Sequence, residues 1–295
     1  MDIYSQADSN VKKTWFYLTT FLILTILIGW FISFLTDTYI VLWIAVIYSF
    51  LISFIAYWNS DKVVLKMSGA KAIEKKDNPE LYRLVENLCI AGGLPLPKIY
   101  IIQDSQPNAF ATGRNPQNGV VAVTTGLLER LEKAELEGVI AHELSHIGNR
   151  DALMQTIIVV LVGVIVLITD LFLRITLSGS RSKNSGGPII LIAALVLSIL
   201  APLAAYILKF AISRKREFLA DASAALLTRY PEGLARALEK ISQDPRQLKK
   251  ANDATAHLYI INPFRGQENQ SWFKKLFLTH PPTQQRIAIL RSKNI

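Results

Sequence analysis

Two histidines, His142 and His146, lie four residues apart in this chain, and Glu143 directly follows the first. On a helix, positions i and i+4 share one face, so both imidazoles can bind one Zn²⁺ while the carboxylate reaches a metal-bound water. The chain has four His and 23 acidic residues among 295, so chance would produce a His-acid-x-x-His pattern roughly 0.004 times. The motif therefore predicts a zinc peptidase site, with one Zn²⁺ per chain, rather than a surface helix with two incidental histidines.

The same site needs a third ligand, because a catalytic zinc commonly takes three protein ligands and a water. The best candidate is Glu217, in the charged segment that follows the last long apolar stretch of the chain. Asp221 lies one helical turn further along, where it can orient a ligand imidazole. Without the histidine motif, both acids would be interpreted as parts of a solvated helix start.

The composition places this site in a membrane protein. Hydrophobic residues make up 51% of the chain and charged residues only 19%, which is too apolar for an ordinary soluble domain of this size. Residues 15–35 and 39–58 carry no charge, and each stretch is long enough to cross a hydrocarbon core of about 30 Å. A cleaved signal peptide is the alternative for the first stretch, but its apolar part is too long and a second span begins almost at once. We therefore expect residues 1–59 to form a transmembrane hairpin.

A second apolar pair follows the histidine motif. Residues 189–208 are uncharged and long enough to span, whereas residues 157–177 are interrupted by Asp170 and Arg174. A charged side chain at the bilayer centre costs about 2.5–3.5 kcal/mol on insertion scales, so this stretch is the weaker candidate. Residues 155–212 are expected to form a second transmembrane or re-entrant hairpin, which brings the predicted transmembrane helices to four.

The remaining segments, residues 60–154 and 213–295, are expected to form the two parts of one peptidase domain. An Asp-Asn-Pro start and a Gly-Gly stop predict a helix over residues 77–90. Three short apolar stretches bounded by turn residues predict a small sheet before the histidine helix, at residues 98–103, 109–113 and 120–124. The predicted fold is thus an α+β membrane protein, with four transmembrane helices and a mainly helical, zincin-like metalloprotease domain that carries a small sheet.

The membrane topology supports the choice of Glu217. If His146 and Glu217 bind one ion, the chain between them must cross the membrane an even number of times, and two apolar stretches lie between them. The two residues lie 11 and 9 positions from those stretches, which corresponds to about 16 and 14 Å of helical rise. Both candidate ligands are therefore expected at a similar depth.

Basic residues predict the orientation of the domain. Lys12 and Lys13 precede the first hairpin, Lys62 and Lys66 follow it, and the loop between its helices has no basic residue. The positive-inside rule then places the peptidase domain in the cytoplasm. The net charge of +9 suits contact with an anionic lipid surface, and no nucleic-acid-binding motif suggests another partner. The single Cys89 excludes an intrachain disulfide.

Several motifs, in this order along the chain, resemble those of the HtpX-type membrane zinc metalloproteases, a family related to the CAAX prenyl proteases. They are NAFATG at 108–113, VAVTTGLL at 121–128, HELSHIGNRD at 142–151, SRKREFLAD at 213–221 and HPPTQQRI at 280–287. The resemblance covers nearly the whole chain. It implies that His142, His146 and Glu217 bind zinc, that Glu143 is the general base and that Asp221 supports the site. It also implies a bacterial inner-membrane protein that degrades misfolded or extended polypeptides in the stress response and protein quality control.

Two further elements are candidates for supporting roles. His280 or Arg286 could donate a hydrogen bond to the oxyanion of the transition state, although a helix start with a solvated arginine is an equal alternative. An exposed edge strand at Asn108, Ala109, Phe110 and Ala111 could bind an extended substrate through main-chain hydrogen bonds. Asn108 could equally be only a turn residue after Pro107.

Other functions remain open from the sequence. Within the protease class, the alternative is a prenyl-protein-type peptidase. A non-catalytic membrane scaffold with structural zinc is less consistent with an intact Glu143, and a transporter, suggested by Asp170 and Arg174, is less consistent with four spans that show no repeat. The expected partners are polypeptide substrates and the lipid bilayer, without nucleic acid, and the sequence does not predict an oligomeric state.

Overall fold

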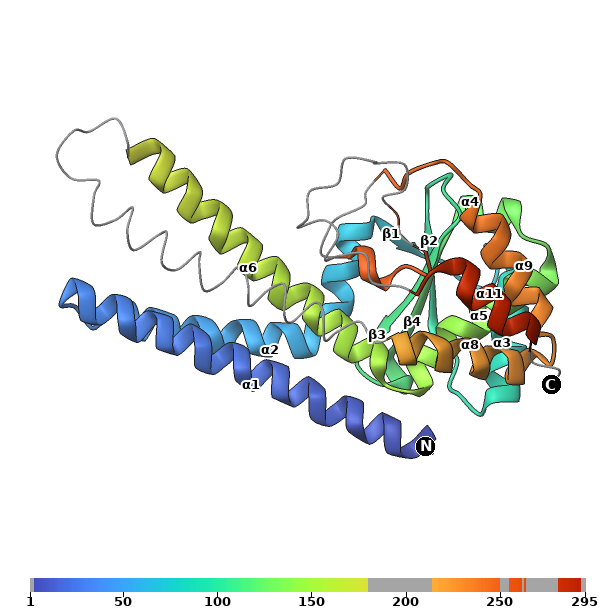
Figure 1. Ribbon diagram of the computed structural model, residues 1–295, viewed down its shortest axis with the longest axis horizontal. Helices are drawn as coiled ribbons and strands as arrows, with labels where there is room; N and C mark the ends of the chain where they lie inside the picture. Colours follow the sequence, from blue (N-terminus) through green and yellow to red (C-terminus); the bar gives the residue numbers. More distant parts are fainter. Residues whose placement is uncertain (1–2, 180–213, 250–254, 262, 264–280, 293–295) are drawn as a thin grey trace.

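A computed structural model describes residues 3–179, 214–249, 255–261, 263 and 281–292 of the chain. Its helices and strands form two parts, an extended helical part and a compact part that contains the sheet (Figure 1). The helices are α1 (Ile3–Thr36), α2 (Ile40–Ser68), α3 (Pro79–Gly92), α4 (Thr125–Arg130), α5 (Lys133–Gly148), α6 (Asp151–Gly179), α8 (Arg214–Thr228), α9 (Pro231–Ser242) and α11 (Thr283–Ser292), with short 3₁₀ turns at Pro116–Asn118 and Ala256–Leu258.

Helices α1 and α2 form the predicted N-terminal hairpin. Asp37 adopts a left-handed conformation (φ 50°) in the tight turn between them. Their backbones approach closely at Gly29, where an added Cβ would lie 2.2 Å from the Ala45 Cβ. Many of their large apolar side chains are exposed, as expected where lipid rather than protein covers them. Helix α2 continues to Ser68, beyond the predicted span, and so connects the hairpin directly to the sheet.

Two helices are long and apolar enough to cross a membrane, over Asp8–Phe34 and Ile40–Ser68. A third span is counted only if α5 and α6, which are bent by 81° at a short break, are taken together. The predicted stretch 157–177 lies within the single helix α6, and the stretch 189–208 lies outside the described residues. The part of the chain that the structure describes therefore contains two or three candidate spans, and four spans remain a prediction.

The sheet has four strands in the order β1-β2-β4-β3. Strands β2 and β4 are parallel, and the other two pairs are antiparallel. Three strands agree with the prediction to within one residue: β2 (Lys98–Ile102), β3 (Ala109–Gly113) and β4 (Gly119–Thr124). The fourth strand, β1 (Ala70–Ala72), was not predicted, because three residues are too short to show a period.

The inner strand β4 is buried on both faces. Val121 and Val123 of β4 pack into the main core with α3, α5, α8, α9 and α11. Val120 and Ala122, on the opposite face, pack against residues of α2, α6 and the 255–261 segment. Successive strand residues point to opposite faces, so one face of the sheet packs on α2 and α6 and the other on α3, α5, α8, α9 and α11.

Helix α5, which carries the histidine motif, lies at the centre of the peptidase part (Figure 1). It begins with a capping box in which Glu132 and Glu135 exchange hydrogen bonds with the first-turn backbone. Gly138 permits close packing on α9, since an added Cβ would lie 2.6 Å from the Leu234 backbone nitrogen. The helix ends at Gly148. Asn149 caps it, and Arg150, in a left-handed conformation (φ 56°), turns the chain into α6.

Candidate metal centre

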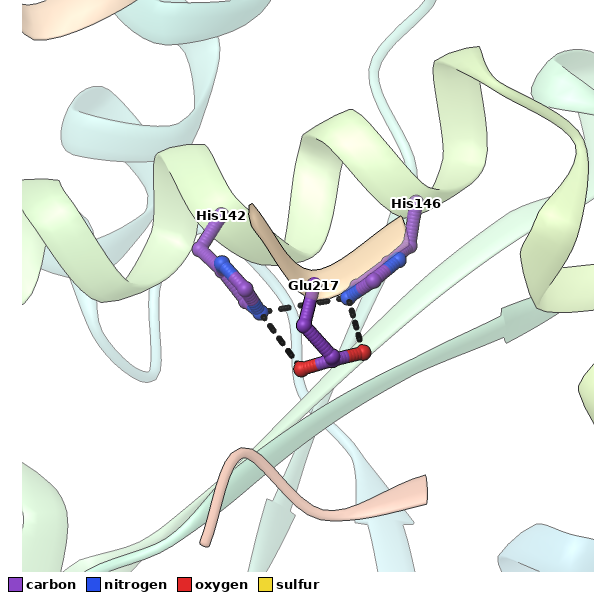
Figure 2. Close-up of side chains that lie close together, drawn as sticks. All are labelled: His142, His146 and Glu217. Atoms are coloured by element: carbon purple, nitrogen blue, oxygen red, sulfur yellow. Dashed lines mark hydrogen bonds and ion pairs between the residues drawn. The ribbon is translucent and has the colours of Figure 1, made fainter. Parts of the chain in front are cut away.

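The two histidines of α5 and one acid of α8 converge on a single point (Figure 2). The Nε2 atoms of His142 and His146 lie 3.1 Å apart. The carboxylate of Glu217 lies across from them, with Oε2 3.8 Å from His142 Nε2 and Oε1 3.7 Å from His146 Nε2. All three side chains are buried, so the structure brings the three predicted ligands together inside the protein.

These separations fit a metal ion. Zinc binds imidazole nitrogen and carboxylate oxygen at about 2.0–2.2 Å, and tetrahedral geometry then puts neighbouring ligand atoms about 3.3 Å apart. The observed distances, from 3.1 to 3.8 Å, bracket that value. Two imidazoles and a carboxylate are also the donor set of a three-ligand catalytic zinc site, which keeps a position for water.

A carboxylate contacts the second nitrogen of each imidazole. Asp221 Oδ1 lies 3.0 Å from His142 Nδ1, and Asp151 Oδ2 lies 3.1 Å from His146 Nδ1. A carboxylate that accepts the Nδ1 proton leaves the Nε2 lone pair directed at the metal position. Asp221 was singled out from the sequence, whereas Asp151 was missed as a site residue although it closes the 142–151 motif.

Arg286 is buried beneath these groups rather than solvated. Its Nε and Nη2 donate to Asp221 at 2.8 and 2.6 Å, and its Nη1 donates to the Ile260 carbonyl at 3.1 Å. The Nη1 atom also lies 3.8 Å from Glu217. The interpretation of Arg286 as a solvated helix-start residue is therefore wrong, because the side chain pairs with an acid of the site. His280, the other candidate of that motif, lies outside the described residues.

The centre carries more acidic than basic groups. Glu143, Asp151, Glu217 and Asp221 are four buried carboxyls. Two buried guanidiniums, those of Arg216 and Arg286, face them, and Arg216 interacts electrostatically with Asp151 and Glu217. Arg216 was not recognised from the sequence, because a charged helix start is usually exposed. The excess of two carboxyls is the balance that a divalent cation would neutralise.

Glu143 lies beside the three candidate ligands and is 1% exposed. Its carboxyl forms a hydrogen bond with the Ala111 backbone of β3, and its Oε2 has no hydrogen-bond partner among the described residues. Burial raises the pKa of Glu143 to about 8. A carboxyl with a pKa near neutrality and a free oxygen is suited to exchange protons with a water or an amine.

The imidazoles have opposite shifts. Burial lowers the pKa of His142. Burial also acts to lower the pKa of His146, but the charges of Asp151 and Glu217 and a hydrogen bond with Asp151 outweigh it and raise this pKa to about 10. The local field thus favours positive charge at His146 in the metal-free protein, and the same field would favour a metal cation.

The expectation of an exposed substrate-binding strand at residues 108–111 is wrong for this conformation. Strand β3 is an edge strand, but its side chains are buried. Its first outward carbonyl, that of Ala109, accepts a hydrogen bond from Ile260 N at 3.0 Å. The Asn108 side chain donates to the Ile261 carbonyl at 2.9 Å, and Phe110 packs edge-on against Tyr259. Asn108, Ala109 and Phe110 therefore hold the 259–261 segment, and Ala111 is the residue of this group that contacts Glu143.

The comparison with known proteins agrees with this geometry. Residues 75–294 match the Peptidase family M48. The chain belongs to this family. A protease HtpX homolog of Dictyoglomus thermophilum is 46% identical over 289 residues, which are 98% of this chain and 94% of the relative. A protease HtpX homolog of Thermococcus sibiricus is 48% identical over 254 residues, 84% of this chain and 85% of that one.

Membership of the M48 family confirms the resemblance to HtpX-type proteases. The chain is a metalloprotease, and its long apolar helices indicate an integral membrane protein. A crystal structure of S. mikatae Ste24p is also similar, with a TM-score of 0.48 and 24% identity, over 92% of this chain and 62% of that one.

Proposed function

We propose that this chain is a zinc-dependent endopeptidase in which His142, His146 and Glu217 hold the metal and Glu143 is the general base. The observation that carries the proposal is the convergence of these three side chains within 4.8 Å, next to a buried carboxyl with an unpaired oxygen. The group has three members among the described residues. A structural zinc usually has four protein ligands, so this geometry favours catalysis over a structural role.

Each residue then has a defined task. A bound zinc would supply a Lewis acid that lowers the pKa of water toward about 7 and polarises the scissile carbonyl. Glu143 accepts the proton of the attacking water and donates it to the leaving amine. Asp151 and Asp221 hold the imidazoles in the tautomer that directs Nε2 at the metal. Arg286 compensates the charge of Asp221, which keeps that carboxylate ionised inside the protein.

The substrate is proposed to be an extended or misfolded polypeptide. His142, Glu143 and Glu217 are at most 3% exposed, so a polypeptide reaches them only after a neighbouring segment moves. The outward backbone of β3 beyond Ala109 is the nearest edge at which an extended chain could then pair. A cavity of about 490 Å³ between α3, α4 and α5 is lined by none of these site residues and is not the substrate cleft.

The domain is proposed to face the cytoplasm of a bacterial inner membrane, with a role in quality control. In Figure 1 the N-terminus of α1 lies beside the peptidase part. Asn10 near that end donates a hydrogen bond to the Asn149 carbonyl at 3.0 Å. The N-terminal Lys12 and Lys13 and the catalytic residues therefore share one side of the membrane, which the positive-inside rule assigns to the cytoplasm.

Cleavage of unfolded casein by the purified, detergent-solubilised protein tests the function. We expect zinc-dependent cleavage by the wild type and none after chelation, with activity restored by added Zn²⁺. A protein that binds one zinc but leaves casein intact under all of these conditions would contradict the proposal.

A further inference from the structure

Aromatic side chains mark the membrane boundaries on the α1–α2 hairpin. Trp15 and Trp58 are about half exposed near the domain end, and the Trp15 ring stacks on Tyr57 with centroids 5.3 Å apart. Phe34 and Tyr39, both strongly exposed, lie near the opposite end. Each of the pairs Trp15–Phe34 and Tyr39–Trp58 is 19 residues apart, which is about 28 Å of helix and matches a hydrocarbon core of about 30 Å. Exposed aromatic rings at such levels favour the membrane interface.

Charged residues begin immediately outside this boundary on the domain side. Lys12 and Lys13 precede Trp15, and Asp61 and Lys62 follow Trp58, whereas the helices between the two levels carry no charge. The level of Trp15 and Trp58 is therefore the bilayer surface that faces the peptidase domain.

The domain contacts the hairpin once at this level and once just outside it. The guanidinium of Arg114, at the turn after β3, lies 4.1 Å from the centre of the Trp58 ring. On the other helix, Asn10 bonds to Asn149 at the end of α5. Asn10 lies five residues beyond Trp15, which is about 7.5 Å along the helix. The domain thus rests on the bilayer surface at a fixed height instead of standing on a flexible linker.

The metal centre lies close to that height. His146 precedes Asn149 by three residues, which adds at most about 4.5 Å. The 81° bend between α5 and α6 turns α5 away from the axis of α6. Residues that precede Asn149 on α5 therefore lie little further from the bilayer surface than Asn149 does. The ligands are therefore about 7–12 Å outside the boundary. This height for His146 is smaller than the value of about 16 Å estimated from the sequence, because that estimate assumed a straight helix from His146 into the membrane.

We propose that this site selects membrane-anchored polypeptides whose scissile bond lies about two to four residues outside the end of a transmembrane helix. This inference rests on the proposed endopeptidase function and names its substrate class. An extended chain spans about 3.3 Å per residue, so about two to four residues cover the height of the site. A bond closer to the bilayer does not reach the metal. A bond on a longer tether arrives at a lower effective concentration, which falls roughly as the −3/2 power of tether length.

The test uses the full chain in lipid nanodiscs with a series of anchored substrates. Each substrate has one transmembrane helix and the same casein-derived cleavage segment, and a Gly/Ser spacer sets the scissile bond 0, 2, 4, 8 or 16 residues from the end of the helix. We expect the initial cleavage rate to be highest with four residues. It should be at least tenfold lower with none, and roughly eightfold lower with 16 residues than with four. Equal rates across the series, or a rate that rises up to 16, would overturn the proposal.

Soluble casein separates this inference from the proposed function. Casein cleavage with no dependence on the spacer overturns only the height argument, whereas loss of both reactions counts against the endopeptidase itself. Arg114→Ala should leave casein cleavage unchanged and broaden the spacer profile, because it removes one contact that holds the height beside the packing of α2 on the sheet. Arg83→Ala, an exposed arginine on α3, is the matched control and should keep the wild-type profile.

Discussion

Asp151 Oδ2 lies 3.1 Å from His146 Nδ1, although the two residues belong to helices that meet at an 81° bend. The turn between α5 and α6 thus brings the first residue of one helix back to a proposed metal ligand on the other. Asp221 of α8 has the same relationship to His142 at 3.0 Å. Each imidazole is therefore oriented by an acid that contacts its Nδ1 atom, on the side of the ring away from the proposed metal position.

Asp151→Asn should weaken zinc affinity by about 10–100-fold, as losses of such supporting carboxylates do. The asparagine keeps the size of the side chain but removes the charge that stabilises the oriented imidazole. Competition with a chromophoric chelator measures the affinity. Glu129→Gln, an exposed acid on α4, is the control. An unchanged affinity in Asp151→Asn would mean that the His146–Asp151 contact does not support the metal.

Glu143→Gln should retain one zinc per chain and lose proteolysis by at least about 100-fold, because it removes proton transfer but no ligand. Metal analysis and casein cleavage on the same preparation check both parts. Glu217→Ala is the contrasting variant and should lose the metal itself. Near-normal cleavage by Glu143→Gln would exclude it as the general base.

Arg286→Met should destabilise the protein by about 3–5 kcal/mol, because it leaves the buried Asp221 carboxylate without its partner. Denaturant unfolding in mild detergent measures the loss. Arg291→Met on the same helix is the matched control, since its partners Glu232 and Glu239 are exposed and such pairs contribute at most about 1 kcal/mol. The double variant Asp221→Asn/Arg286→Met should recover part of the loss, and equal destabilisation by the two Arg variants would contradict the buried pair.

Cys89 should be nearly unreactive toward maleimide in the folded protein at pH 7 to 8. The side chain is 3% exposed, and burial raises the pKa of its thiol from 9.0 to about 11. Because the raised pKa belongs to the folded state, this group favours folding below pH 9, and that contribution is lost as the pH rises toward 11. Thiol modification before and after denaturation tests this, and rapid reaction of the native protein would contradict it.

Because Cys89 is expected not to react in the folded protein, the topology can be tested with single introduced cysteines. Glu74→Cys and Gln243→Cys, at exposed positions before and after the second apolar pair, should react with an impermeant reagent from one and the same side. That side is expected to be the cytoplasm. Labelling of the two positions from opposite sides would exclude a metal centre shared by α5 and α8.

The sequence by itself determined the features that depend on neighbouring residues. The i, i+4 spacing put both histidines on one face of α5, and uncharged stretches predicted α1 and α2. Local turn residues predicted β2, β3 and β4. These features follow from the helical and strand periods and from bilayer thickness, which act over a few residues to one helix length. The need for a third ligand and the even number of apolar stretches between His146 and Glu217 suggested that Glu217 joins the histidines, and the family resemblance implied the same.

The tertiary structure alone decided the contacts between distant segments. The pairing of Arg286 with Asp221, the contact of Asp151 with His146 across a bend and the closure of the β3 edge by Ile260 have no local signal. The same holds for the height of the site above the bilayer, because a two-residue break turns α5 by 81°. Burial is the physical reason for these pairings. A charged or polar group removed from water must find a partner, and packing of the whole chain decides which one lies within reach.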